Sequence, residues 1–380
     1  MIFILMLLIF ILLSLFYGWF LSKIYSGLRN IPDSDDATGE NSVSSVSIII
    51  PFRNESDNIL NSLQHITSQN YPSDEYEVIY VNDSSADDSL QKIISADKPA
   101  NIKVISVPAD FHSKAHKKRA IRYALQFAQG EIIASTDCDC FMGADWLRTM
   151  IGCFNSNTAF VSGPVDFYDN STLSGRLQRL EFAGLVLSGA GLIGSGTPTI
   201  CNAANLAYRK SVFDEVGGFD DNIKLSSGDD EILMQKIAAA TTYNINFCSS
   251  RKAVVSTYPN RTFGQFYQQR KRWASKGLFY VDKKLIAKLF LIFLFYLSLP
   301  VQLLLIILGN FIFLYSFTAA LAVKTIIEYR IMKYGEKKIY GKGLTECFLL
   351  AEILHVPYII IAAISGAAGN FKWKDRNLKR

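Results

Sequence analysis

Three long runs of apolar residues constrain this chain more than any other feature. They cover residues 2–22, 285–323 and 344–368, and the stretch between the first two is mixed in polarity. A helix of about 20 apolar residues crosses a bilayer, so residues 1–30 are predicted to contain one transmembrane helix. The second run is too long for one crossing, and residues 285–327 are expected to form two transmembrane helices. The chain is therefore interpreted as a membrane protein with a soluble domain between its anchors.

Basic residues lie beside these apolar runs and indicate the topology. Two of them follow the first run, and residues 328–343 are expected to form a basic cytoplasmic loop. The positive-inside rule then places the soluble domain in the cytoplasm, in a multi-pass protein of the cell (inner) membrane. Residues 344–368 either cross the membrane or re-enter it as a hairpin bent at Pro357, which would keep the basic tail at 369–380 in the cytoplasm. The net charge of +5 suits a membrane surface, and no basic stripe with interleaved aromatics predicts a nucleic-acid partner.

The soluble part begins after a polar linker at residues 31–45 and alternates between strand and helix patterns. Strands are expected at residues 46–50, 77–83, 102–107 and 132–136, and helices at 56–69, 86–96 and 114–128. This alternation predicts an α/β fold with a doubly wound parallel sheet. In such sheets ligands bind beyond the carboxyl ends of the strands.

Asp137 and Asp139 follow the last of these strands directly. Residues i and i+2 of an extended chain point the same way, so the two carboxylates can converge on one point. Two hard oxygen ligands suit Mg²⁺ or Mn²⁺, and the alternative is a solvated turn at the end of the strand. Cys138 and Cys140 alternate with the aspartates and are expected to face the opposite side.

The order of several motifs gives the chain a specific resemblance. It resembles a membrane-anchored member of glycosyltransferase family 2, in the group of cellulose synthase, poly-N-acetylglucosamine synthase and ceramide glucosyltransferase. The resemblance implies a GT-A nucleotide-diphospho-sugar transferase domain at 46–261 and an interfacial amphipathic helix at 262–284. The motifs are Ile50-Pro51-Phe52-Arg53-Asn54-Glu55, Val81-Asn82-Asp83-Ser84-Ser85, Lys117-Lys118-Arg119-Ala120, Asp137-Cys138-Asp139, Gly228-Asp229-Asp230 and Gln269-Arg270-Lys271-Arg272-Trp273.

The resemblance also implies roles for donor-binding residues. Asp83 would accept the N–H of uracil, with Arg53 and Glu55 lining the same pocket. Asp137 would touch the ribose or phosphates of the nucleotide, and Asp139 would hold the metal. Lys117 would contact the diphosphate, although it lies in a basic run that could equally form a solvated helix face. The glycine that usually precedes this lysine is His116 here.

The later motifs supply the predicted base and the acceptor site. Asp230 would take the proton from the acceptor hydroxyl, and Asp229 stands where the family often has Glu. Gln269 and Arg272 would face the donor, with Trp273 as a stacking floor for the acceptor. Asn202 and Asn205 would line the sugar pocket, or they could be buried amides that satisfy loop backbone.

These assignments predict an inverting, metal-dependent transfer of a sugar from a cytosolic UDP-sugar. The acceptor would be a hydroxyl of a membrane-associated lipid or glycan, with Mg²⁺ or Mn²⁺ as cofactor. One base and no carboxylate nucleophile imply a single displacement, by the logic of inverting glycosidases. Alternatives are a subunit of a processive polysaccharide synthase, a nucleotidyl- or phospho-sugar transferase, and a non-catalytic membrane scaffold.

Overall fold

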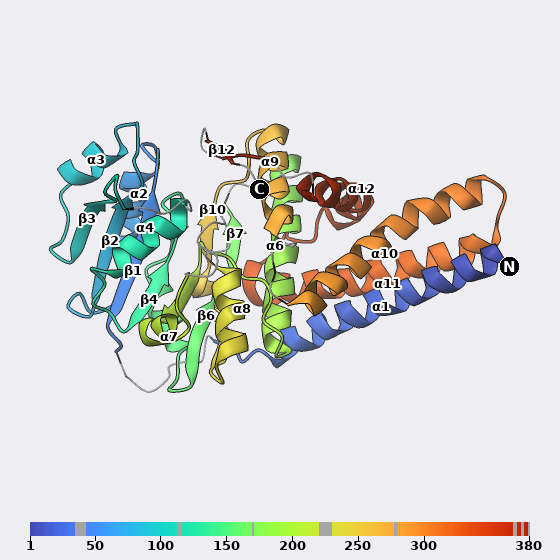
Figure 1. Cartoon of the computed structure of the whole chain (residues 1–380), viewed down its shortest axis with the longest axis horizontal. Coiled ribbons are helices and arrows are strands. Elements are labelled where there is room, and N and C mark those ends of the chain that lie inside the picture. Colours follow the sequence, from blue (N-terminus) through green and yellow to red (C-terminus); the bar gives the residue numbers. More distant parts are fainter. Residues whose placement is uncertain are drawn as a thin grey trace.

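The computed structural model describes residues 1–34, 43–111, 116–168, 171–219, 230–276, 280, 282–367, 371–373 and 376–378. Most of the predicted linker, Gly228, Asp229 and part of the basic tail therefore lie outside the described residues. The chain forms an α/β domain at one end and a bundle of long helices at the other (Figure 1).

A central seven-stranded sheet organises the α/β domain, in the order β3-β2-β1-β4-β8-β6-β9. The strands are β1 (Val46–Phe52), β2 (Tyr76–Asn82), β3 (Ile102–Ser106), β4 (Ile132–Ser135), β6 (Thr158–Ser162), β8 (Leu206–Arg209) and β9 (Asn244–Phe247). The first four pair in parallel, as the strand–helix alternation predicts. However, β8 runs antiparallel to both β4 and β6, so the sheet is mixed rather than parallel. The resemblance to the family implies a strand and then a helix within residues 200–219, where β8 lies, but the strand–helix alternation ends at β4 and gives no sign that β8 is antiparallel.

Short helices cover both faces of the sheet. They are α2 (Ile59–Thr67), α3 (Ser89–Ser95), α4 (His116–Leu125), α5 (Trp146–Gly152), α7 (Lys210–Glu215) and α8 (Glu231–Ala240). Along β1, Ile48 and Ile50 belong to one core cluster while Ile49 belongs to the other. The strand is therefore buried on both faces, as expected for the central strands of an α/β sheet. A small second sheet joins β5 (Phe141–Met142), β10 (Val255–Thr257) and β7 (Val165–Phe167).

The bundle consists of α1 (Ile2–Asn30), α10 (Lys283–Ile307) and α11 (Ile312–Gly335), which run lengthwise side by side (Figure 1). The predicted loop at 328–343 is wrong in its first part, because α11 continues to Gly335 and a π-helix follows at Glu336–Tyr340. The basic residues of this stretch lie along a helix whose other faces are apolar. A high density of positive charge therefore does not identify a loop here.

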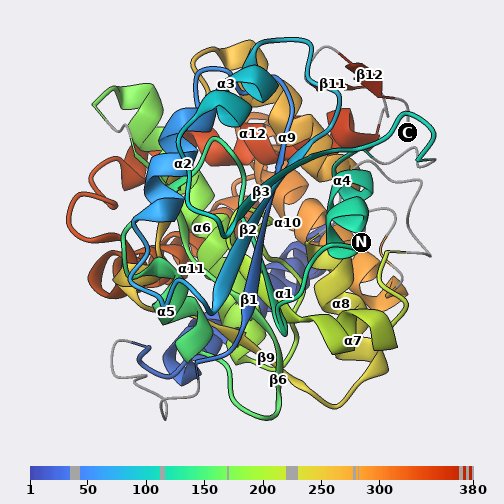
Figure 2. The ribbon, with the colours of Figure 1, turned by 90° about the vertical axis from the view of Figure 1, so that its left-hand side faces the viewer.

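Three further helices lie crosswise between the bundle and the sheet. They are α6 (Leu173–Gly194), α9 (Phe263–Lys276) and α12 (Phe348–Ala367). Figure 1 shows α12 nearly end-on, and Figure 2, turned by a right angle, shows it lengthwise. The helix is continuous through Pro357, so a hairpin bent at this residue is ruled out. A two-stranded hairpin of β11 (Phe371–Trp373) and β12 (Arg376–Leu378) follows. By length and composition, α1, α10, α12 and the helical stretch Ile312–Tyr340 could each cross a membrane.

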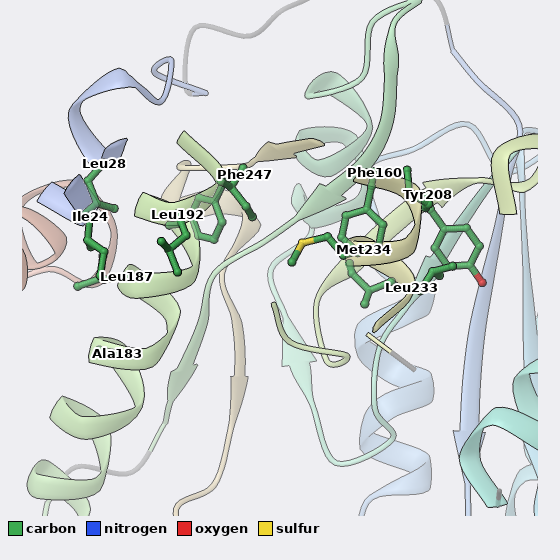
Figure 3. Packing of buried hydrophobic residues seen from close by; sticks show 14 of the residues in the cluster. Ile24, Leu28, Phe160, Ala183, Leu187, Leu192, Tyr208, Leu233, Met234 and Phe247 are labelled. Carbon is green, nitrogen blue, oxygen red and sulfur yellow. The ribbon is translucent and has the colours of Figure 1, made fainter. Parts of the chain in front are cut away.

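The first helix packs tightly on the α/β domain. Ile24 and Leu28 of α1 are buried beside Leu187 of α6 (Figure 3). The backbones of α1 and α6 also touch, because a Cβ placed on Gly27 would lie 1.9 Å from the carbonyl oxygen of Gly191. Only glycines allow this approach, so α1 is part of the domain core rather than a detached anchor.

Candidate functional site

A cavity of about 1730 Å³ opens at the carboxyl ends of the parallel strands and extends to the long helices. One part, here called the charged end, holds nearly all the side chains that the sequence singled out. These are Arg53, Glu55, Asp83, Lys117, Asp137, Asp139, Asp230, Gln269 and Arg272, with Trp273 nearby. The other part, here called the apolar end, is walled by α6, α10 and α12 through Leu185, Val186, Ile286, Phe290, Ile359 and Ala363.

The loops after β1 and β2 are joined at the charged end. Arg53 donates from Nη1 to the carbonyl oxygens of Asp83 at 2.8 Å and Ser84 at 2.6 Å. Ser84 adopts a positive φ of 58°, which this bridge helps to hold. The Asp83 carboxylate accepts from Nη2 of Arg119 at 2.7 Å, and both side chains are largely buried. Arg119 belongs to one of the motifs quoted from the sequence, but the sequence assigns it no role.

Lys117 lies against Asp137, with 2.5 Å between Nζ and Oδ1. The lysine is therefore turned into the cavity, although it belongs to a run that could have formed a solvated face. At the end of β4, the Lys117 ammonium could therefore bind a diphosphate while the Asp137 carboxylate binds a cation.

The segment after β4 is a turn rather than extended chain, because the N–H of Cys140 donates to the carbonyl oxygen of Asp137 at 3.2 Å. The expectation that both cysteines face away is consequently wrong for Cys140. Its sulfur lies with the carboxylates of Asp137 and Asp139, the ligand atoms all within 4.8 Å of one another. Burial, followed by the charges of Asp139 and Asp137, raises the pKa of the Cys140 thiol well above its usual value. Mg²⁺ and Mn²⁺ prefer oxygen ligands to sulfur, so the two carboxylates are the groups in this cluster that fit a hard divalent cation.

Asp230 lies at the start of α8 and is 7% exposed. Its Oδ2 accepts from the N–H of Ala203 at 3.2 Å, which ties it to the segment before β8. Tyr280 also lines the cavity, and the sequence did not identify it. Burial and then the nearby carboxylates of Glu231 and Asp230 raise the pKa of Tyr280 well above its usual value. The tyrosine therefore stays protonated beside the predicted base and can donate a hydrogen bond.

Helix α9 supplies the remaining predicted residues. Oε1 of Gln269 accepts from Nδ2 of Asn260 at 2.8 Å, and Trp273 stacks on Phe182 with ring centres 5.7 Å apart. Arg270, which the sequence analysis did not assign, is 3% exposed and lies over the Trp273 ring at 4.3 Å. The helix therefore presents its aromatic side chain on a fixed support.

The structure contradicts the prediction that Asn205 binds the acceptor. The side chain is fully buried and does not line the cavity. Its Nδ2 donates to the carbonyl oxygens of Pro164 and Ala253, both at 2.8 Å, while Oδ1 accepts from Trp146 at 3.0 Å. These bonds satisfy the amide inside the protein, which was the alternative interpretation of this residue. Asn202, in contrast, lines the cavity.

Residues 47–217 match the model of the family "Glycosyl transferase family 2". The chain therefore contains a glycosyltransferase family 2 domain. This glycosyltransferase is 28% identical over 232 residues to "Glycosyltransferase AglE" of Haloferax volcanii, an alignment that covers 60% of this chain and 71% of the relative. It is 24% identical over 239 residues to "Poly-beta-1,6-N-acetyl-D-glucosamine synthase" of Staphylococcus epidermidis, covering 62% of this chain and 55% of the synthase. The chain thus matches only about half of that second relative.

A solved structure extends the likeness to nearly the whole glycosyltransferase chain. It is the mannosyltransferase PcManGT from Pyrobaculum calidifontis in complex with GDP-Man and Mn²⁺, with a TM-score of 0.58 and 18% identity. The match covers 96% of this chain and 98% of the other. The expected fold, a GT-A-like α/β domain accompanied by long apolar helices, is confirmed, with the sheet mixed.

Proposed function

We propose that this glycosyltransferase moves a sugar from a nucleoside diphosphate to a hydroxyl of a membrane-associated lipid. The observation that carries the proposal is the continuity of the cavity, which joins the carboxylates after β4 to the apolar walls from α10 and α12. A polar nucleotide-sugar fits the charged end, while a hydrocarbon chain would bury apolar surface at the other end.

The donor is proposed to be a UDP-sugar. Asp83 would accept the N–H of the base, supported by Arg119, while Arg53 holds the loop that carries it. Lys117 and Arg272 line the same cavity as cations for the diphosphate. The related PcManGT is in complex with GDP-Man and Mn²⁺, which supports a nucleoside diphosphate donor and a divalent cation without deciding between uracil and guanine.

The proposed reaction is a single displacement with inversion. The acceptor oxygen attacks the anomeric carbon, the bond from that carbon to the diphosphate breaks, and Asp230 takes the hydroxyl proton. Asp139 and Asp137 would hold Mg²⁺ or Mn²⁺, which when bound neutralises charge on the leaving diphosphate. Asp230 and Tyr280 both line the cavity, which places the proposed base where an acceptor hydroxyl could reach it.

The proposed topology has α1, α10 and α11 crossing the membrane and α9 and α12 lying along its cytoplasmic surface. Their crosswise orientation in Figures 1 and 2 supports this arrangement. With three crossings the N-terminus is outside, and the catalytic domain and the basic tail are both cytoplasmic. The tail then agrees with the positive-inside rule without a hairpin.

The test uses purified protein in detergent with Mg²⁺ or Mn²⁺ and a panel of UDP- and GDP-sugars. Release of nucleoside diphosphate would be followed with a membrane lipid extract, with a soluble oligosaccharide, and with neither. We expect release from one UDP-sugar only when lipid is present, with the sugar recovered in the organic phase and its anomeric configuration inverted. Transfer to the oligosaccharide alone would refute the lipid acceptor and favour glycan elongation. No release with any donor would favour a non-catalytic scaffold.

A further inference from the structure

Helix α12 reaches the active-site helix α9 through a half-buried carboxylate. Tyr358 of α12 donates to Oε1 of Glu181 on α6 at 2.9 Å. Glu181 in turn accepts from Nε of Arg270 at 3.0 Å, with a second ion-pair contact through Nη2. Since the Arg270 guanidinium lies 4.3 Å from the centre of the Trp273 ring, Tyr358 is connected to Trp273 through two intervening side chains.

The C-terminal end of α12 also touches α9 directly. Tyr267 of α9 donates to Oγ of Ser365 on α12 at 2.7 Å. A Cβ placed on Gly366 would come within 2.6 Å of Cβ of Ala274, so the backbones approach closely there. The position of α9 therefore depends on the position of α12.

The preceding turns of α12 are fixed to the bundle by charged groups. Lys324 of α11 is fully buried and donates to Glu352 at 2.7 Å and to Glu328 at 3.0 Å. His355 lies 3.7 Å from Glu328, and its ring stacks on that of Tyr358 at 6.2 Å. Separating such buried charges would leave them unpaired, which is strongly unfavourable, so this cluster holds α12 in register with the bundle.

We propose that Tyr358 is a positioning residue for acceptor binding, which sets Arg270 and Trp273 through Glu181. The contacts of Lys324 with Glu328 and Glu352 hold helix α12 in place. The bidentate Glu181–Arg270 pair then fixes Trp273 relative to α12. The claim that Trp273 binds the acceptor rests on the proposed function. The claim that Tyr358 fixes the position of α9 rests on the contacts alone.

The test is Tyr358→Phe, which removes one hydroxyl and keeps the ring. Loss of the hydrogen bond to the Glu181 carboxylate should let Arg270 and Trp273 shift, so we expect the acceptor KM to rise about tenfold, with the donor KM unchanged. Amide hydrogen exchange of the purified protein should become faster in Phe263–Lys276. Tyr334→Phe is the matched control, because Tyr334 of α11 donates to the carbonyl oxygen of Leu28 at 2.8 Å and is remote from α9 in the chain of contacts.

The exchange measurement separates this inference from the proposed function. Faster exchange in α9 for Tyr358→Phe, but not for Tyr334→Phe, supports the positioning role even if no lipid serves as acceptor, an outcome that would count against the proposed function alone. Unchanged exchange in α9, or an equal increase in both variants, would overturn the inference. In a cycle with Glu181→Gln, exchange effects that add independently would also overturn it, since residues acting through one another are not additive.

Discussion

The charged end and the apolar end of the cavity are built in different ways. At the charged end, short loops after β1, β2 and β4 hold ion pairs such as Arg119–Asp83 and Lys117–Asp137 close to each strand. At the apolar end, long helices from distant parts of the chain provide the walls and a few buried polar contacts fix their spacing. The difference suggests that electrostatics governs the donor and apolar burial governs the acceptor. Substitutions should then separate donor binding from acceptor binding.

The largest effect is expected at the proposed base, Asp230, in the charged end. Asp230→Asn should lower kcat by about a thousandfold, because an amide cannot accept the hydroxyl proton. Donor affinity, measured by isothermal titration with the nucleoside diphosphate, should be retained. Glu215→Gln, at an exposed site on α7, is the control. Full turnover by Asp230→Asn would show that another group is the base.

Removal of the metal should act at the charged end alone. Chelation is expected to stop transfer, and Asp139→Asn should raise the Mn²⁺ concentration needed for half-maximal activity by roughly 100-fold. Asp145→Asn, at the start of α5, should leave this titration unchanged. An Asp139→Asn enzyme with wild-type metal dependence would exclude this carboxylate as a ligand.

Arg119→Met tests the electrostatic side of the comparison. Loss of the guanidinium leaves the buried Asp83 carboxylate without this partner, so donor KM should rise about tenfold, or about 1.4 kcal/mol, with acceptor KM unchanged. Arg122→Met, on the same helix outside the cavity lining, is the comparison variant. Equal changes in both KM values would mean that the two ends are coupled.

Ala363→Trp tests the apolar side. An indole in the cavity wall should exclude part of the acceptor chain and raise acceptor KM about fivefold, on the order of 1 kcal/mol. Donor KM should stay the same. Ile361→Trp, at a site on α12 that is exposed and does not line the cavity, should have no such effect. Weaker donor binding by the Ala363→Trp variant would contradict the assignment of the acceptor to the apolar end.

The smallest effect is expected away from the cavity, at Glu77. Partial burial opposes ionisation, but hydrogen bonds from Lys103, Gln129 and Ser47 outweigh it and lower the pKa of Glu77. Stability from such a carboxylate is present above its unfolded pKa and is lost as pH falls through its folded pKa. Glu77→Gln should lower Tm by about 2 °C at pH 7, with the difference closing below the ordinary Glu pKa of about 4.3. Asp74→Asn is the exposed control, and a constant difference at all pH values would refute the ionic origin.

The charged end could be predicted from sequence because its groups directly follow strands. Spacing alone could not choose among neighbouring cations, so Lys117 was identified and Arg119 was missed, although both point at carboxylates. An amide such as Asn205 gives no sequence signal that separates a ligand from a buried structural group. The orientation of a helix cannot be predicted from composition either, because the composition of α12 fits a membrane-spanning helix as well as one that lies crosswise to the bundle. Tyr280 and Glu181 reach the cavity only through tertiary packing.

The contact between Gly27 and Gly191 has a consequence for how the protein is made. Residues 1–30 are synthesised before α6, against which they pack. The domain can complete its core only after α1 has packed on α6, so under the proposed topology membrane insertion and domain folding would be one coupled event. A chain that started after the anchor would expose Leu187 and its neighbours and would aggregate rather than yield a free enzyme.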